Sequence, residues 1–303
     1  MDALRRALDE RRSGLRRNDF PRSRVDTWIG RIDGADEEGA VDWTGQEHWE
    51  SRNNALVRIG LEADGFLDQV AGCRERFGPH RVGVAIGTST SSIGRTEEAY
   101  ALGAEPVFAG GYCQPRVHNP HSPGAYVAHL TGVRGPQITI STACASSARV
   151  FATGWRWLQA GLVDAVLVGG IDSLCHSVLA GFQSLELTSP DPCRPFDANR
   201  NGINLGEAAG YAILMRAADA PAGAVRLAGY GESSDAYHMS QPPPGGEGAQ
   251  RSMRDALGRA GIDGSELGYV NPWLSRRTWK PNRSVPSGQT GCILRWSLRL
   301  RRS

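Results

Sequence analysis

The sequence of 303 residues has 40% hydrophobic and 22% charged residues and a formal net charge of +2. This composition is ordinary for a globular chain of one or two domains, and so small a net charge argues against nucleic-acid or anionic-membrane partners. The six cysteines have neither CxxC nor zinc-finger spacing, so neither a disulfide framework nor a metal site is indicated. With no signal peptide and no bilayer-length apolar run, the sequence predicts a cytoplasmic protein.

Helical and strand patterns alternate in the first part of the chain. The spacing of apolar residues predicts an amphipathic helix over 2–17 and a second helix over 54–70. Between them, residues 28–46 are rich in Gly and Asp and are predicted to form a surface segment. A buried strand is expected at 81–86, followed by a Ser/Thr/Gly loop over 88–94 and a helix after it.

The later part of the chain repeats this alternation. His118 and His121 lie in a stretch rich in Pro and Asn, and with no third ligand nearby a solvated loop is favoured over a metal pair. Wholly apolar strands are typical of a sheet covered on both faces, so we expect an α/β layered fold. The predicted elements are a helix at 125–130, a strand at 136–142, a helix at 145–161, a strand at 165–171, a helix at 173–187, strands at 208–215 and 225–230, and a helix at 249–260.

Cys144 is the most informative residue of the chain. Residues 137–147 read Gln-Ile-Thr-Ile-Ser-Thr-Ala-Cys-Ala-Ser-Ser, which predicts a strand, a turn of small residues around the thiol, and a helix opening at Ser146. Free N–H groups and the positive end of a helix dipole at that position favour thiolate over thiol. Such a thiolate suits a nucleophile that forms a thioester, although a buried structural cysteine fits the spacing equally well.

Seven segments of the chain carry recognisable motifs, among them Arg-Pro-Phe-Asp at 194–197 and Gly-Glu-Ala-Ala-Gly at 206–210. The seven segments are 82–90, 138–147, 164–170, 194–200, 206–210, 233–238 and 267–271. In this order they resemble those of elongating β-ketoacyl-[acyl-carrier-protein] synthases, and the resemblance runs from about residue 4 to residue 270. The resemblance implies a thiolase-like αβαβα sandwich of two duplicated halves. It assigns a nearly complete N-terminal half to residues 1–216, the start of an incomplete C-terminal half to 217–270, and a basic tail unlike the family to 271–303.

The resemblance also implies a chemistry. Cys144 would accept an acyl chain from the 4'-phosphopantetheine arm of acyl carrier protein, and decarboxylation of a malonyl unit would supply the carbanion that attacks the resulting thioester. The Cys144 N–H would form half of the oxyanion hole. Phe182, in Leu-Ala-Gly-Phe at 179–182, matches a position that shapes the acyl pocket, and plain core packing is compatible with that role. No cofactor is expected, and a homodimer is expected through residues 135–141.

The sequence departs from the family after Asn271. There the family continues with His-Gly-Thr, whereas this chain continues with Pro-Trp-Leu, and no histidine follows His238. Both active-site histidines and the Gly-Phe-Gly-Gly-Thr loop therefore have no counterpart, and residues 271–303 contain eight Lys or Arg, three Trp and no acidic residue. We expect a synthase truncated at both ends with an out-of-frame tail.

Three functional hypotheses follow. The first is a β-ketoacyl-acyl-carrier-protein synthase, and the second is a catalytically incompetent remnant that acts at most in dimerisation or acyl binding. The third, a thiolase-fold relative acting on coenzyme A esters, is disfavoured by the motifs at 194–197 and 234–238. Cys144 also argues against the chain-length-factor partners of these synthases, because they lack the cysteine.

Overall fold

The computed structural model describes residues 2–35, 41–101, 116–238 and 243–270. The basic tail predicted at 271–303 lies outside the described residues. Among the helices that are described, none combines the length and the apolar character that crossing a membrane requires.

A four-stranded sheet forms the centre of the structure, in the order β4-β3-β5-β7. Its strands are β3 (Val82–Gly87), β4 (Gln137–Ile140), β5 (Ala165–Asp172) and β7 (Ala208–Met215). β3 pairs in parallel with both β4 and β5, and β7 runs antiparallel beside β5. The prediction that the apolar segments 81–86, 136–142 and 165–171 share one central sheet is confirmed. β3 is buried along its whole length because both faces of the sheet are covered.

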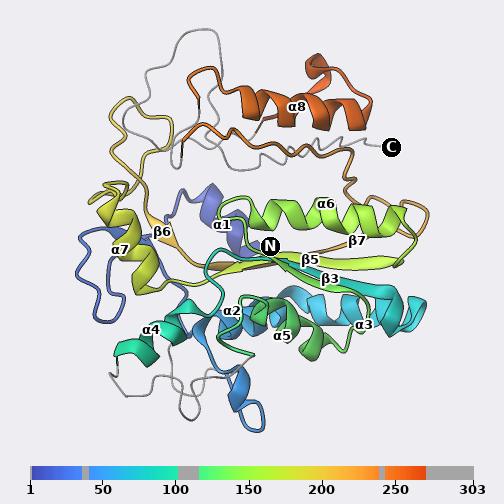
Figure 1. Ribbon diagram of the computed structural model, residues 1–303, viewed down its shortest axis with the longest axis horizontal. Helices are drawn as coiled ribbons and strands as arrows, with labels where there is room; N and C mark the ends of the chain where they lie inside the picture. Colours follow the sequence, from blue (N-terminus) through green and yellow to red (C-terminus); the bar gives the residue numbers. More distant parts are fainter. Residues whose placement is uncertain (1, 36–40, 102–115, 239–242, 271–303) are drawn as a thin grey trace.

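Helices cover the two faces of this sheet unequally (Figure 1). On one face lie α2 (Arg52–Glu62), α3 (Phe66–Phe77) and α5 (Ser122–Thr131), and on the other lies α6 (Ser146–Gln159). Each face has its own apolar core. The larger core lies under the three helices and includes Leu56, Leu61, Val84, Ile86 and Tyr126. The smaller one lies under α6 and includes Val150, Val166 and Val168.

A further helix, α8 (Glu247–Ala260), lies beyond α6 (Figure 1). Tyr230 contacts both helices: its ring lies edge-on to Trp155 of α6, and its carbonyl oxygen accepts a hydrogen bond from Arg259 of α8. Glu232 of the same segment accepts hydrogen bonds from Arg149 and Arg156 of α6. The predicted strand at 225–230 is wrong, since the structure has no strand there. A strand needs a hydrogen-bonded neighbour, and none of the sheets in the described residues includes this segment.

The N-terminal predictions also need correction. Helix α1 covers only Asp2–Asp9, and Arg11 adopts a left-handed φ of 52°. Residues 28–46 are not simply a surface segment, because Ile29 is completely buried in the strand β2. This strand belongs to a small second sheet in the order β1-β2-β6. The strands of that sheet are β1 (Arg16–Arg17), β2 (Trp28–Gly30) and β6 (Leu205–Gly206).

The single helix predicted over 54–70 is two helices, α2 and α3. Asp64 and Gly65 have φ values of 55° and 68°, and this left-handed Asp-Gly pair interrupts an apolar period that otherwise continues. α2 begins where Ser51 accepts a hydrogen bond from the Asn54 N–H at 3.1 Å. The remaining α-helices of the described residues are α4 (Ile93–Ala101) and α7 (His176–Ser184). Short 3-10 turns occur at Glu47–Trp49, Ala63–Gly65, Pro79–Arg81 and Gly264–Glu266.

Candidate active site

The carboxyl edge of the central sheet holds both residues that the sequence singled out. β3, β4 and β5 are parallel, so their carboxyl ends share one edge, and each is followed by a helix: α4, α6 and α7 respectively. Cys144 lies between β4 and α6, and Phe182 lies on α7 after β5. In open α/β sheets this is the edge at which ligands bind.

A tight turn presents Cys144 at the start of α6. Ala143, just before it, has a left-handed φ of 50°, which is uncommon for a residue with a Cβ atom and often marks a functional turn. The Ser146 hydroxyl holds the turn together: it donates to the Ala143 carbonyl oxygen at 2.6 Å and accepts from the Thr142 N–H at 2.8 Å. The Cys144 thiol is exposed, whereas Ala145 and Ser146 behind it are buried.

The backbone around Cys144 limits which amides are available to a ligand. The N–H groups of Ala145 and Ser146 donate within the turn, to the carbonyl oxygens of Thr142 at 3.2 Å and Ala143 at 3.1 Å. These two amides are therefore engaged within the turn, and the oxyanion role of the Cys144 N–H stays a prediction; the N-terminal end of α6 adds a partial positive charge beside it.

Two glycines let the start of α6 lie directly on the sheet. A Cβ atom at Gly87, the last residue of β3, would lie 2.4 Å from the Ser147 nitrogen and 2.5 Å from the Ser146 carbonyl carbon. A Cβ atom at Gly170 of β5 would lie 2.4 Å from the Ser147 Cβ. Both glycines belong to segments that carry the family resemblance, but the sequence alone did not indicate this packing role.

Buried or partly buried carboxylates hold the neighbouring loops in place at the carboxyl edge of the central sheet. Asp172, the last residue of β5, accepts hydrogen bonds through Oδ1 from the backbone N–H groups of Ser89 at 2.6 Å and Thr90 at 3.0 Å. The Thr88 and Thr90 hydroxyls donate to the same oxygen at 3.0 and 3.1 Å. This carboxylate therefore fixes the loop between β3 and α4. The sequence analysis missed it, although an acidic residue directly after an apolar strand is a usable signal.

Glu207, from the Gly-Glu-Ala-Ala-Gly motif, makes a second such tie. Its side chain is completely buried and pairs with Arg52, whose Nε donates to Oε2 at 2.8 Å. The backbone N–H groups of Ile32 and Leu174 donate to the same carboxylate at 2.9 and 3.0 Å. A buried carboxylate is tolerated when it is paired and hydrogen-bonded in this way. Glu207, between β6 and β7, thus holds together the end of β2, the start of α2 and the β5–α7 loop.

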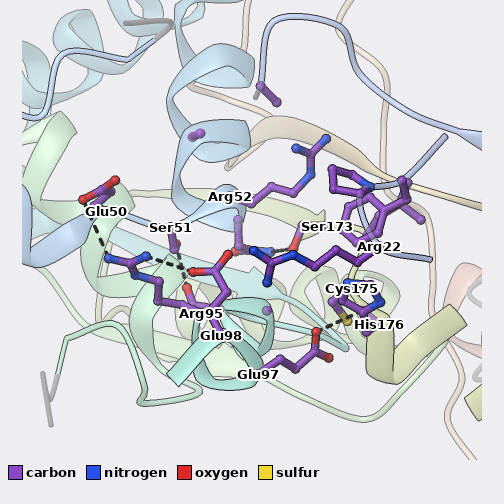
Figure 2. Close-up of a pocket in the computed structure, with 18 of the residues that line it drawn as sticks. Arg22, Glu50, Ser51, Arg52, Arg95, Glu97, Glu98, Ser173, Cys175 and His176 are labelled. Carbon is purple, nitrogen blue, oxygen red and sulfur yellow. Dashed lines mark hydrogen bonds and ion pairs between the residues drawn. The ribbon is translucent and has the colours of Figure 1, made fainter. Parts of the chain in front are cut away.

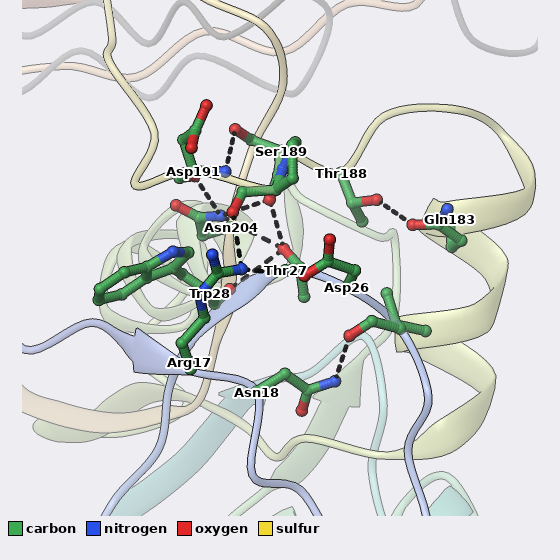
Figure 3. A network of polar contacts seen from close by, with 12 residues as sticks. Arg17, Asn18, Asp26, Thr27, Trp28, Gln183, Thr188, Ser189, Asp191 and Asn204 are labelled. Atoms are coloured by element: carbon green, nitrogen blue, oxygen red, sulfur yellow. Dashed lines mark hydrogen bonds and ion pairs between the residues drawn. The ribbon is translucent and has the colours of Figure 1, made fainter.

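The Arg-Pro-Phe-Asp motif lies in a loop held against β2. Thr27 donates to the Ser189 carbonyl oxygen at 2.7 Å, and the Asn204 amide donates to the carbonyl oxygens of Ser189 and Asp191, each at 3.2 Å (Figure 3). Within the loop, Arg200 donates to the Asp197 carbonyl oxygen at 2.8 Å.

A cavity of about 910 Å³ lies beside α4 and the start of α7 (Figure 2). Charged side chains of both signs line it, among them Arg22, Arg95, Glu97 and Glu98. Neither Cys144 nor Phe182 belongs to its lining, so this cavity is not the pocket that the sequence predicted around the thiol. Phe182 is half-buried on α7, one turn beyond Leu179, which is buried in a small apolar cluster.

Burial separates Cys144 from the other thiols. Burial raises the pKa of Cys175 to about 12, and burial also raises the pKa of Cys73. Since the thiolate is the nucleophilic form, burial disfavours the reactive form of both thiols. Cys193 is half-buried, which leaves Cys144 as the exposed thiol among the cysteines that the structure describes.

The fold and this turn define a layered α/β protein with an exposed cysteine at a strand–helix junction. The family model for the N-terminal domain of β-ketoacyl synthase matches residues 20–220, and the model for its C-terminal domain matches residues 224–272. The chain therefore belongs to the β-ketoacyl synthase family and has a thiolase-like fold.

Known relatives agree with this assignment. The chain is 33% identical over 202 residues to nodulation protein E of Rhizobium leguminosarum bv. trifolii, covering 63% of this chain and 49% of that protein. It is 31% identical over 203 residues to 3-oxoacyl-[acyl-carrier-protein] synthase 2 of Staphylococcus aureus, covering 63% and 50%. A solved ketosynthase (ApeO) in complex with its chain length factor (ApeC) from Xenorhabdus doucetiae superposes with a TM-score of 0.72 at 36% identity, covering 85% of this chain and 62% of that one. The chain spans about half the length of the curated relatives it matches.

Proposed function

We propose that this chain is an acyltransferase of the β-ketoacyl synthase type, with Cys144 as the residue that carries the acyl group. The observation that carries the proposal is the exposed Cys144 thiol in a left-handed turn at the N-terminal end of α6, in a chain of this family. The proposed acyl donor is acyl carrier protein, which presents acyl chains as thioesters on 4'-phosphopantetheine. The name of the Staphylococcus aureus relative supports that choice.

Acyl transfer needs a nucleophile and an oxyanion donor, and the turn offers both. The Cys144 thiolate attacks the carbonyl carbon of the carrier thioester, forming a new carbon–sulfur bond and placing negative charge on the carbonyl oxygen. The Cys144 N–H and the N-terminal end of α6 stabilise that oxyanion. Collapse of the intermediate breaks the bond to the carrier sulfur, which leaves as a thiolate and takes up a proton. The acyl chain then remains on Cys144 as a thioester.

Condensation additionally requires groups that stabilise an enolate. Decarboxylation of malonyl-carrier protein releases carbon dioxide and leaves an enolate, whose attack on the Cys144 thioester forms the β-ketoacyl product and frees the thiol. The resemblance assigns stabilisation of this enolate to two histidines, and the sequence has no histidine after His238. That observation favours a second candidate function, in which the chain binds acyl groups and dimerises without condensing them.

The proposal extends to assembly and location. β4 is an edge strand of the central sheet, and its Ile138 side chain is 37% exposed, so we propose that two chains pair through residues 135–141.

A thiol nucleophile also requires a reducing compartment, and we place the chain in the cytoplasm. The proposed domain division is 1–216 and 217–270, with a boundary after β7.

The test follows the acyl group. The chain is incubated with acyl-acyl-carrier protein, and peptide mass spectrometry identifies the modified cysteine. We expect modification at Cys144, loss of modification in Cys144→Ala, and full modification in the matched control Cys193→Ala. Modification that persists in Cys144→Ala contradicts the proposal.

Addition of malonyl-carrier protein separates the two candidate functions. Loss of one preorganised donor slows turnover by roughly a hundred- to a thousandfold, so loss of both histidines predicts no measurable release of carbon dioxide or β-ketoacyl product. Product formed at rates on the order of one per second shows instead that this chain supplies the donors from other residues.

A further inference from the structure

Helix α7, which carries Phe182, receives its N-terminal cap from another helix. Its own N-cap residue, Cys175, makes no side-chain cap hydrogen bond. The carboxylate of Glu97, on α4, takes that role: Oε2 accepts from the His176 N–H at 2.9 Å and Oε1 accepts from the Ser177 N–H at 2.6 Å. Figure 2 shows Glu97 reaching across the cavity wall toward His176.

This contact matters because α7 is short. The first N–H groups of a helix have no partner inside the helix, and one carboxylate here satisfies two of them at the positive end of the helix dipole. A helix of nine residues is marginal without tertiary contacts, so its direction depends on what holds its ends. α4 packs closely against the start of α7, since a Cβ atom at Gly94 of α4 would lie 3.6 Å from the Cys175 Cβ. This packing places Glu97 within reach of the first N–H groups of α7.

A second anchor fixes the middle of α7. Leu179 is 1% exposed and packs in a cluster with Ile29 of β2 and Leu174. Phe182 follows Leu179 by three residues, so the two side chains are neighbours on the helix surface. Leu179 holds the middle of α7 in place. Loss of the hydrogen bonds from the His176 and Ser177 N–H groups to Glu97 is therefore expected to tilt α7 about Leu179 and to move Phe182.

We propose that Glu97 is a positioning residue that sets the orientation of α7 and, through Phe182, the length of acyl chain that Cys144 accepts. This inference rests on the proposed acyl transfer to Cys144 and adds a determinant of its substrate range. Glu97 acts only through α7, and the acyl group moves from the donor sulfur to the Cys144 sulfur as described above, with release of the donor thiol.

The experiment compares two acyl donors of different length. Acetyl and decanoyl thioesters of N-acetylcysteamine are incubated separately with the full chain, and the rate of Cys144 acylation is followed by mass spectrometry. The variants are Glu97→Ala, which removes both acceptors, and Glu97→Gln, which keeps one. Glu98→Gln is the matched control, because Glu98 is the adjacent residue, is exposed and pairs with Arg95 at 2.8 Å.

We expect the decanoyl-to-acetyl rate ratio to change by about fivefold in Glu97→Ala, the population change that typically follows loss of one helix cap. Glu97→Gln should lie between this variant and the parent, and Glu98→Gln should match the parent. Acetyl transfer should be unchanged in all four proteins, because a two-carbon chain makes the smallest demand on the acyl pocket that the family resemblance assigns to Phe182. Amide exchange at Ser177 should be faster by a similar factor in the Glu97 variants.

Two results overturn the inference. An unchanged rate ratio in Glu97→Gln does so, and so does equal slowing of both donors, which indicates a purely structural role. If Glu97→Ala does not fold, Glu97→Gln alone decides. If the parent chain takes up neither acyl group, the proposed function fails, and exchange at Ser177 still decides whether Glu97 holds α7.

Discussion

Gly87 gives the sharpest test of how the nucleophile turn is supported. The substitution Gly87→Ala adds one methyl group where the end of β3 meets the start of α6. That methyl carbon would lie 2.4 Å from the Ser147 nitrogen and 2.5 Å from both the Ser146 carbonyl carbon and the Ser147 Cα, all of them backbone atoms. A flexible side chain does not absorb this clash, so the helix start or the strand end has to move.

The size of the effect follows from these distances. Ordinary van der Waals contact begins at 3.4 Å, so the backbone has to shift by roughly 1 Å. Overpacking of this kind costs about 3 kcal/mol, which corresponds to a fall in melting temperature of roughly 5–10 °C for a chain of this size. A displacement of about 1 Å at a catalytic group slows reaction by about a hundredfold, and the shifted segment begins two residues after Cys144.

The assay measures melting temperature and the rate of Cys144 acylation together. Gly210→Ala is the matched control, because Gly210 lies in the same sheet and a Cβ atom there would meet nothing within 4 Å. We expect the control to be neutral or slightly stabilising, since alanine restricts the unfolded chain more than glycine does. If Gly87→Ala and Gly210→Ala behave alike in both measurements, the close approach of α6 to β3 does not support the turn.

Two further predictions concern the sheet. The Asp164 carboxylate accepts hydrogen bonds from Arg81 and Arg216, and these two guanidinium groups lower its pKa to about 2. The stability that the ionised carboxylate contributes should therefore be present above about pH 4 and be lost toward pH 2. The melting temperature of the parent should exceed that of Asp164→Asn at pH 6, and the gap should close on acidification, whereas a gap independent of pH contradicts the ion-pair explanation. Ile138→Lys should weaken self-association through β4, as measured by light scattering, whereas Leu162→Lys at another exposed position serves as the control and should not. A parent chain that stays monomeric at micromolar concentration refutes the proposed pairing.

The central sheet was predictable because its signals are local. The strands β3 and β5 are buried on both faces and therefore read as unbroken apolar runs, and β7 begins and ends where its pattern predicts. The nucleophile turn was predictable for a similar reason: the strand, the small residues and the helix start are contiguous in sequence. Cys144 itself is exposed at the expected junction, and its catalytic role stays a prediction until acylation is measured.

The missed elements depend on partners that are distant in sequence or on backbone geometry. β2 is three residues long, and its parallel partner begins at Leu205, so nothing near Ile29 indicates a strand. The break between α2 and α3 did have a signal in Asp64-Gly65, but the apolar period runs through it and favours one helix. The segment 225–230 shows the reverse error, since strand-like composition forms no strand without a neighbour.

The carboxylates of the carboxyl edge explain why the site was harder to predict than the fold. Glu97, Asp172 and Glu207 each accept backbone N–H groups from segments between 33 and 175 residues away. A hydrogen bond of this kind produces no periodic pattern in the sequence, because its donor is a backbone N–H group that any residue other than proline supplies. A carboxylate shielded from water is costly unless its acceptors are filled, so each of these residues requires its loop to be in place. The loops at the carboxyl edge of the sheet are therefore positioned by acids that look like ordinary surface residues in the sequence, and substitutions at these acids should alter this edge before they alter the sheet.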